Sequence, residues 1–80
     1  MKVILESTDK IVSLETAAGA VPARIWEGQT DSGVPVHAYI TRVAVPTNLP
    51  AAAHEQFKRE LAEQRAPSMG VAAIPLRLVL

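Results

Sequence analysis

The chain contains no cysteine among its 80 residues. This absence excludes disulfide bonds as a means of stabilising a small fold, and it excludes a catalytic thiolate. A structural zinc site is not expected either, because the sequence offers only two histidines, His37 and His54, and no thiolate ligand. We therefore expect no metal and no cofactor. The absence of cysteine also fits a protein of a reducing compartment, and we expect the protein to be cytoplasmic.

Aromatic residues and net charge are scarce as well. The chain has one Trp, one Tyr and one Phe, and its eight basic and eight acidic residues cancel. A protein that neutralises nucleic-acid phosphates generally carries an excess of Lys and Arg, so general nucleic-acid binding is not expected. No apolar run approaches the roughly 20 residues that cross a bilayer, and Glu6 interrupts the first apolar residues soon after Lys2. We expect neither a signal peptide nor a membrane partner.

Apolar residues, in contrast, are abundant and make up 49% of the chain. A length of 80 residues suits a single domain, 1–80, whose own core supplies only a few kcal/mol of stability. Disulfides and metals are excluded as additional sources of stability, so association between chains is the source that is left. We therefore expect a homo-oligomer, with residues 74–80 or the second hairpin described below at the interface.

Two short apolar segments open the chain, 2–6 and 11–15, and each is typical of a strand. If the intervening residues Thr8 and Asp9 form a two-residue loop, Leu5 lies opposite Val12 on the same face of the pair. This agreement predicts a first β-hairpin.

A second hairpin is predicted from two longer segments, 21–27 and 34–45, which are rich in β-branched and aromatic residues. The residues between them, 29–33, are typical of a turn. Pro22 and Pro35 cannot donate hydrogen bonds to a neighbouring strand, so they belong near strand ends or at an edge of the sheet.

The second half of the chain predicts one helix and one strand. Residues 51–65 are good helix formers, and apolar residues recur every four positions along one side. These are Leu49, Ala53, Phe57 and Leu61. The strict alternation over 74–80 predicts a final strand, and Pro75 places that strand at an edge. The predicted fold class is α+β, a mainly antiparallel sheet in the order β-β-β-β-α-β with one helix packed on one face.

Signatures of catalysis are missing from the sequence. It holds no glycine-rich phosphate loop, no HExxH, no GxSxG and no cysteine nucleophile. The ionisable residues cluster between Glu55 and Arg65, at a spacing typical of the solvated side of an amphipathic helix. We therefore predict that the protein is not an enzyme.

The candidate ligand-binding residues belong to the second hairpin and combine basic and aromatic side chains. They are Arg24, Trp26, His37, Tyr39 and Arg42. Gathered on one face, such side chains would form a platform suited to stacking a base and binding a phosphate.

Whether they gather depends on the register of the hairpin. A two-residue loop of Ser32 and Gly33 puts Trp26 opposite Tyr39 and Arg24 opposite Thr41, with His37 on the same side, and so forms the platform. Arg42 shares the strand parity of Val36, Ala38 and Ile40, so it either ends the core face or pairs at an interface. A three-residue loop that adds Asp31, with Gly33 left-handed, puts Trp26 opposite Ala38. Trp26 would then join Val36 and Ile40 in the core, and His37 and Tyr39 would face the other way. The sequence leaves both registers open.

Four segments carry a resemblance to known proteins: VPARIWEG (21–28), SGVPVHAYITRVAV (32–45), FKRELAEQRAPS (57–68) and AIPLRLVL (73–80). They resemble small open reading frames carried by phages and prophages. Such phage proteins include anti-defence sponges, among them the Thoeris anti-defence families, which sequester nucleotide signals of bacterial immunity in pockets at oligomer interfaces. The resemblance implies a non-enzymatic oligomeric binder of a nucleotide-like ligand, in the cytoplasm of a bacterial host.

A second hypothesis comes from a different class of function. The second hairpin and the C-terminal strand would bind a macromolecular partner, in a protein-interaction or structural module. This reading is compatible with either register of the hairpin, whereas the nucleotide platform requires the two-residue loop.

Overall fold

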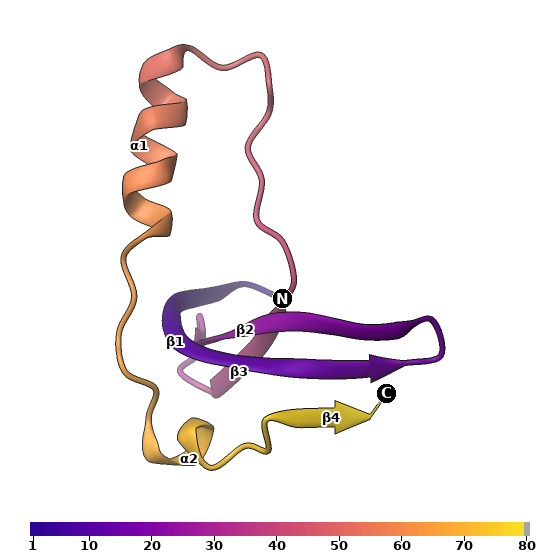
Figure 1. The fold of residues 1–80 in the computed structure, drawn as a ribbon. Coiled ribbons are helices and arrows are strands. Elements are labelled where there is room, and N and C mark those ends of the chain that lie inside the picture. The colour runs from indigo at the N-terminus through magenta and orange to yellow at the C-terminus, as the bar shows by residue number, and fades with distance from the viewer. Residues whose placement is uncertain (80) are drawn as a thin grey trace.

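The computed structural model describes residues 1–79, which form an α+β fold with a mixed four-stranded sheet (Figure 1). Its elements are β1 (Val3–Thr16), β2 (Gly19–Thr30), β3 (Pro35–Ile40), α1 (Ala51–Leu61), α2 (Met69–Ala72) and β4 (Arg77–Val79). The strands lie in the order β3-β2-β1-β4. The predicted α+β class is confirmed. The prediction of a mainly antiparallel sheet needs correction at one edge, because β4 runs parallel to β1.

The predicted first hairpin is wrong, because β1 is one continuous strand of 14 residues. It pairs along its length with β2, and the register shifts between Ser7 and Ile11, where β1 contains two extra residues. The polar segment that resembles a turn is accommodated inside this irregularity. The Thr8 side chain is fully buried and donates a hydrogen bond from Oγ1 to the carbonyl oxygen of Ile25 at 2.6 Å. A contact with a residue distant in sequence therefore replaces the local turn.

The second hairpin is present, and its register is the one with the three-residue loop. Thr30 pairs with Val34 across the loop, Gly33 adopts a φ of 90°, and Trp26 lies opposite Ala38. A left-handed φ is readily adopted by glycine, which has no Cβ. The loop length therefore decides which side chains share a face.

The core lies on one face of the sheet and is small. The buried apolar residues are Val12, Leu14, Ala23, Ile25 and Val71, with Ile74 and Leu78 packed against them. The strands supply the first four, and the short helix α2 and the C-terminal segment cover them. Ser68 caps the N-terminus of α2, where its Oγ accepts a hydrogen bond from the Val71 backbone N–H.

The C-terminal strand is shorter than predicted. Residues 74–80 were expected to form a strand with one leucine face, whereas β4 covers Arg77–Val79. Leu78 packs on the core, but Leu76 is 67% exposed, so the apolar face is only partly covered. Leu80 lies outside the described residues.

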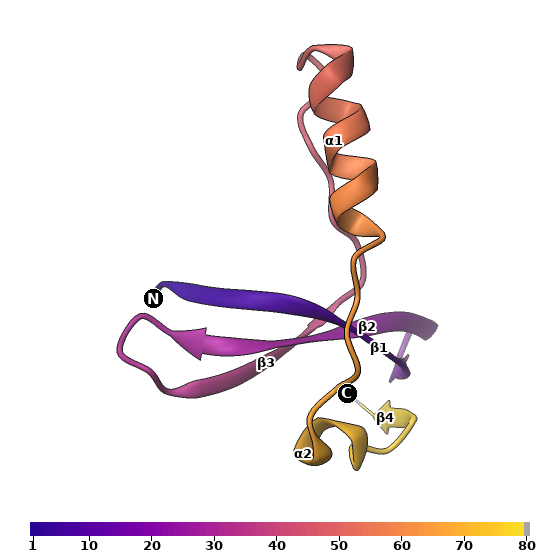
Figure 2. The ribbon, with the colours of Figure 1, turned by 90° about the vertical axis from the view of Figure 1, so that its left-hand side faces the viewer.

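Helix α1 lies on the opposite side of the sheet from α2 and stands away from the strands (Figure 2). It ends at Leu61, four residues before the predicted end, and within the described chain none of its residues is buried. The expectation that this helix packs over the core is therefore wrong, since α2 occupies that position. Neither helix of residues 1–79 has the length and apolar composition that crossing a membrane requires.

Gly28 provides a test of the pairing between β1 and β2. A Cβ placed on Gly28 would lie 1.7 Å from the Ile4 carbonyl oxygen, which is backbone and cannot move aside cheaply. We expect Gly28→Ala to lower the free energy of unfolding by at least about 3 kcal/mol. Urea denaturation measures this change.

Gly70→Ala is the matched control, because nothing lies within 4 Å of the added Cβ and Gly70 is helical. It should leave stability unchanged or raise it by up to about 1 kcal/mol. Equal losses for the two variants would contradict the observed register.

Candidate functional site

A cleft of about 580 Å³ lies between the C-terminal end of α1 and the sheet, on the face opposite the core. Its walls are mostly apolar and come from β1, β2, the end of β3 with the residues that follow it, and the C-terminal end of α1 with the residues that follow it. The apolar lining consists of Ile11, Pro22, Ala23, Trp26, Ile40, Val43, Leu61 and Ala62. The only Trp of the sequence is thus part of a concave, largely apolar surface.

Three cationic side chains, Arg24, Arg42 and Lys58, line the same cleft. No carboxylate among residues 1–79 lines it, and its remaining polar residues are Thr41 and Gln64. We call this surface the cationic cleft. Charges of one sign in a cleft with apolar walls attract ligands of the opposite sign, here anions.

Arg24 is held in place by the irregularity of β1. Its Nη1 donates a hydrogen bond to the Thr8 carbonyl oxygen at 2.9 Å. A guanidinium has five N–H donors, so this contact orients the group and leaves further donors for a ligand. The buried Thr8 therefore connects the register shift in β1 to the position of a cleft residue.

The five candidate ligand-binding residues are divided between the two faces of the sheet. Arg24, Trp26 and Arg42 line the cleft. His37 and Tyr39 lie opposite Glu27 and Ile25 in the register and therefore belong to the other face. Their own side chains meet there, with a hydrogen bond of 3.3 Å between Nε2 and Oη and ring centroids 5.5 Å apart. The predicted platform, with Trp26 opposite Tyr39, is wrong because the loop has three residues. The core position expected for Trp26 in that register is wrong as well, because Trp26 lies on the face opposite the core.

Lys58 is the cleft residue that the sequence pattern did not identify. It belongs to the charged residues interpreted as the solvated side of the helix, and it is exposed. Its position three residues before Leu61 places both on neighbouring parts of the helix surface. This spacing is the one feature of the sequence that could have suggested Lys58. Lys58 lines the cleft only because the C-terminal end of α1 lies near Trp26 in the fold.

A second hollow of about 340 Å³ adjoins the cleft and shares Trp26 and Gln64 with it. Its charged lining is mainly acidic, from Glu6, Glu60 and Glu63, together with Arg65. Trp26 therefore lies at the boundary between a cationic and an acidic surface.

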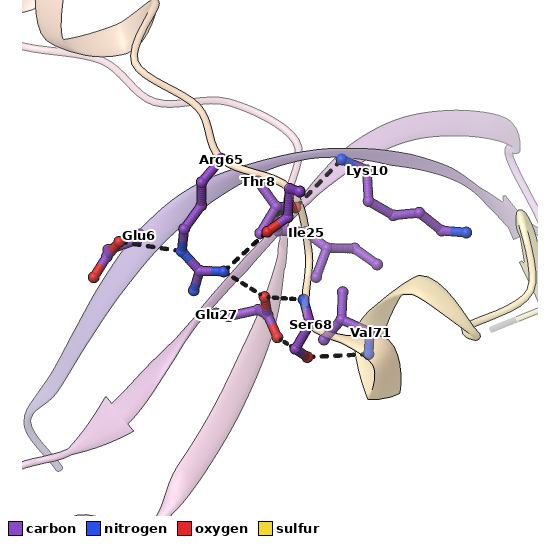
Figure 3. Close-up of polar contacts among 9 residues, drawn as sticks. Glu6, Thr8, Lys10, Ile25, Glu27, Arg65, Ser68 and Val71 are labelled. Carbon is purple, nitrogen blue, oxygen red and sulfur yellow. Dashed lines mark hydrogen bonds and ion pairs between the residues drawn. The ribbon is translucent and has the colours of Figure 1, made fainter.

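The segment that follows α1 is fixed to the sheet by a polar cluster (Figure 3). Glu27 on β2 is 8% exposed, and its Oε2 accepts hydrogen bonds of 2.9 Å from Arg65 Nη1 and from the Ser68 backbone N–H. The Ser68 hydroxyl donates to the other carboxylate oxygen. Arg65 also donates from Nε to Glu6 Oε2 at 3.1 Å. One buried carboxylate thus holds both the end of the segment that leaves α1 and the start of α2.

The environment of Glu27 also changes its ionisation. The hydrogen bonds from the Ser68 hydroxyl and backbone N–H lower the pKa of Glu27 below its ordinary value of 4.5, and Arg65 adds to this effect against the opposing influence of burial. The hydrogen bond to Glu27 in turn raises the pKa of Arg65. The cluster is therefore an ion pair at neutral pH.

Metal binding finds no support in the side-chain arrangement. No group of three or more His, Asp or Glu side chains within residues 1–79 is placed to hold a metal ion.

In comparisons with protein-family models, with curated proteins and with solved structures, the chain matches none of them.

The Glu27 cluster predicts a pH dependence of stability. Because the pKa of Glu27 is lower in the folded chain, the unfolded chain binds the proton first as the pH falls below 4.5. The stabilisation is complete above that value and is lost as the pH falls through the folded pKa.

At pH 7, Glu27→Gln should lower the free energy of unfolding by about 1–3 kcal/mol, since an amide N–H₂ would face donors of Ser68 and Arg65.

Denaturation with urea at a series of pH values measures both effects. We expect Glu27→Gln to show a weaker loss of stability in acid than the unsubstituted chain. Glu63→Gln, at an exposed carboxylate outside the cluster, serves as the control and should retain that loss. An acid transition that is unchanged in Glu27→Gln would contradict this role of the cluster.

Proposed function

We propose that the protein is a non-enzymatic binding module whose cationic cleft takes a small, planar, anionic ligand of nucleotide-like chemistry. The observation that carries the proposal is the joint presence of Trp26 and three cationic groups around one largely apolar cleft. An aromatic face stacks on a base, and guanidinium and ammonium groups bind phosphate oxygens.

The size and composition of the cleft support a ligand of this class. A volume of about 580 Å³ lies within the roughly 300–1,000 Å³ typical of small-molecule sites. The cations come from three different parts of the chain: Arg24 from β2, Arg42 from the segment after β3, and Lys58 from α1. A ligand that bridges them would fix the helix relative to the sheet.

The expected affinity follows from the number of contacts. Stacking on an aromatic side chain contributes about 1–3 kcal/mol per base, and a charge-assisted hydrogen bond is about twice as strong as a neutral one. One stacking contact with two or three charge-assisted contacts supports micromolar affinity after the entropy of association is subtracted. The resemblance to small phage proteins makes cyclic and linear nucleotides the first ligands to test, as signals that such a module would sequester.

Binding is measured by calorimetry against a panel of cyclic and linear nucleotides, with inorganic phosphate and a nucleoside alone as the separate parts. Trp26 supplies a second readout, because the fluorescence of the only Trp reports directly on the cleft. Arg42→Ala should weaken binding at least about tenfold, equivalent to about 1.4 kcal/mol. The ligand should be recovered chemically intact after heat release.

Two control variants separate the cleft from the rest of the surface. Arg59→Ala removes the same charge from the exposed side of α1, outside the cleft lining. Tyr39→Ala removes an aromatic side chain from the opposite face of the sheet. Both should bind like the unsubstituted protein. If no panel member binds, or if Arg42→Ala and Arg59→Ala lose affinity equally, the proposal is wrong.

A further inference from the structure

The isolated chain exposes more surface than a compact protein of its mass. Its accessible area is 5913 Å² for 8.6 kDa. The scaling of area with mass gives about 4,700 Å² for a compact monomer of this size. The radius of gyration of 14.3 Å likewise exceeds the roughly 12 Å expected for 80 residues. The excess of about 1,200 Å² is comparable to the roughly 800 Å² that each partner buries in a standard protein–protein interface.

One part of this exposed surface is the sheet face opposite the core. The register places Val3, Leu5, Val36 and Ala38 on this face, next to Trp26. Val3 is 42% exposed, and α1, the helix on this side within residues 1–79, lines the cleft with the sheet only through its C-terminal end. We call these four residues the outer sheet face. None of them lines the cationic cleft.

The other part is the arm formed by residues 41–61, which comprises an extended segment and α1 lying alongside it (Figure 1). The apolar stripe of the helix has no sheet beneath it, and within residues 1–79 α1 has no buried residue. Leu49, at the outer part of the arm, is 38% exposed. The arm therefore presents an amphipathic helix without a partner on the same side of the molecule as an apolar sheet face without a cover.

We propose that these two surfaces cover each other between two copies of the chain, so that the arm of each copy packs on the outer sheet face of the other. Helix packed on sheet is the usual way in which α+β folds bury both surfaces. Within one chain α1 points away from the sheet and does not lie on it. A two-fold arrangement uses the same patch on both copies and closes without leaving an unpaired surface. A second copy is the occupant that satisfies both surfaces at once.

The test uses neighbouring residues of β1 whose side chains point to opposite faces. Val3→Lys places a charge on the outer sheet face, whereas Ile4→Lys places the same charge on the other face, where Ile4 is already 71% exposed. Sedimentation and native mass spectrometry of the full chain should show a dimer. Val3→Lys should raise its dissociation constant at least about tenfold, because an interface that buries an unpaired ammonium is penalised. Ile4→Lys should leave it unchanged.

Cross-linking tests the exchange of arms independently of stability. The chain has no native cysteine, so each introduced cysteine is unique. A mixture of Val3→Cys and Leu49→Cys proteins, treated with a short thiol cross-linker, should give the mixed pair, and replacing Val3→Cys by Ile4→Cys should abolish it. A monomer throughout the micromolar range overturns the proposal, as does a dimer that Ile4→Lys weakens and Val3→Lys does not. A dimer without the mixed cross-link overturns the exchange of arms.

Discussion

The carboxylate of Glu27 is the interaction on which the path of the second half of the chain depends. The segment after α1 starts on the side of the sheet that carries the cleft and must reach the other side, where the core lies. It passes the edge of β1, where the backbone of Arg65 bonds to Ser7 and Asp9 in the manner of a short parallel strand. Glu27 then binds Arg65 and Ser68 together. Glu27 thus joins the segment that leaves α1 to the start of α2, in addition to the backbone hydrogen bonds of Arg65 and the burial of Val71.

The core and the cleft are therefore coupled through one strand. The side chain of Glu27 points to the core side of β2, and that of its neighbour Trp26 points to the cleft side. Val71 reaches the core because Ser68, held by Glu27, caps α2, and Lys58 lies at the cleft because the chain beyond α1 is held at Arg65. Local alternation along a strand thus places a structural group and a candidate binding group back to back.

The sequence predicted the α+β class, the second hairpin and the existence of α1, each of which follows from periodicity and turn residues that act locally. It did not predict the continuous β1, because a buried hydrogen bond from Thr8 to Ile25 outweighs the turn propensity of the polar residues around it. It left open which face each side chain of the hairpin occupies. One loop residue decides that, and both loop lengths are compatible with the same composition. Lys58 became a cleft residue only through the tertiary position of the helix.

The two extra residues in β1 determine which face of the sheet the side chains on either side of them occupy. Side chains alternate between faces with a period of two, so an insertion of two residues returns the strand to its original phase. Leu5 before the irregularity and Ile11 after it therefore both point to the cleft side, while Glu6 and Val12 both point to the core side. Loss of a single residue within 8–10 would reverse the faces that the side chains of one half of β1 occupy, so that Ile11 and not Val12 would point to the core. Loss of two residues would leave the side chains of both halves on their present faces. The face that each side chain of β1 occupies therefore depends on whether the number of residues in this stretch changes by an odd or an even number.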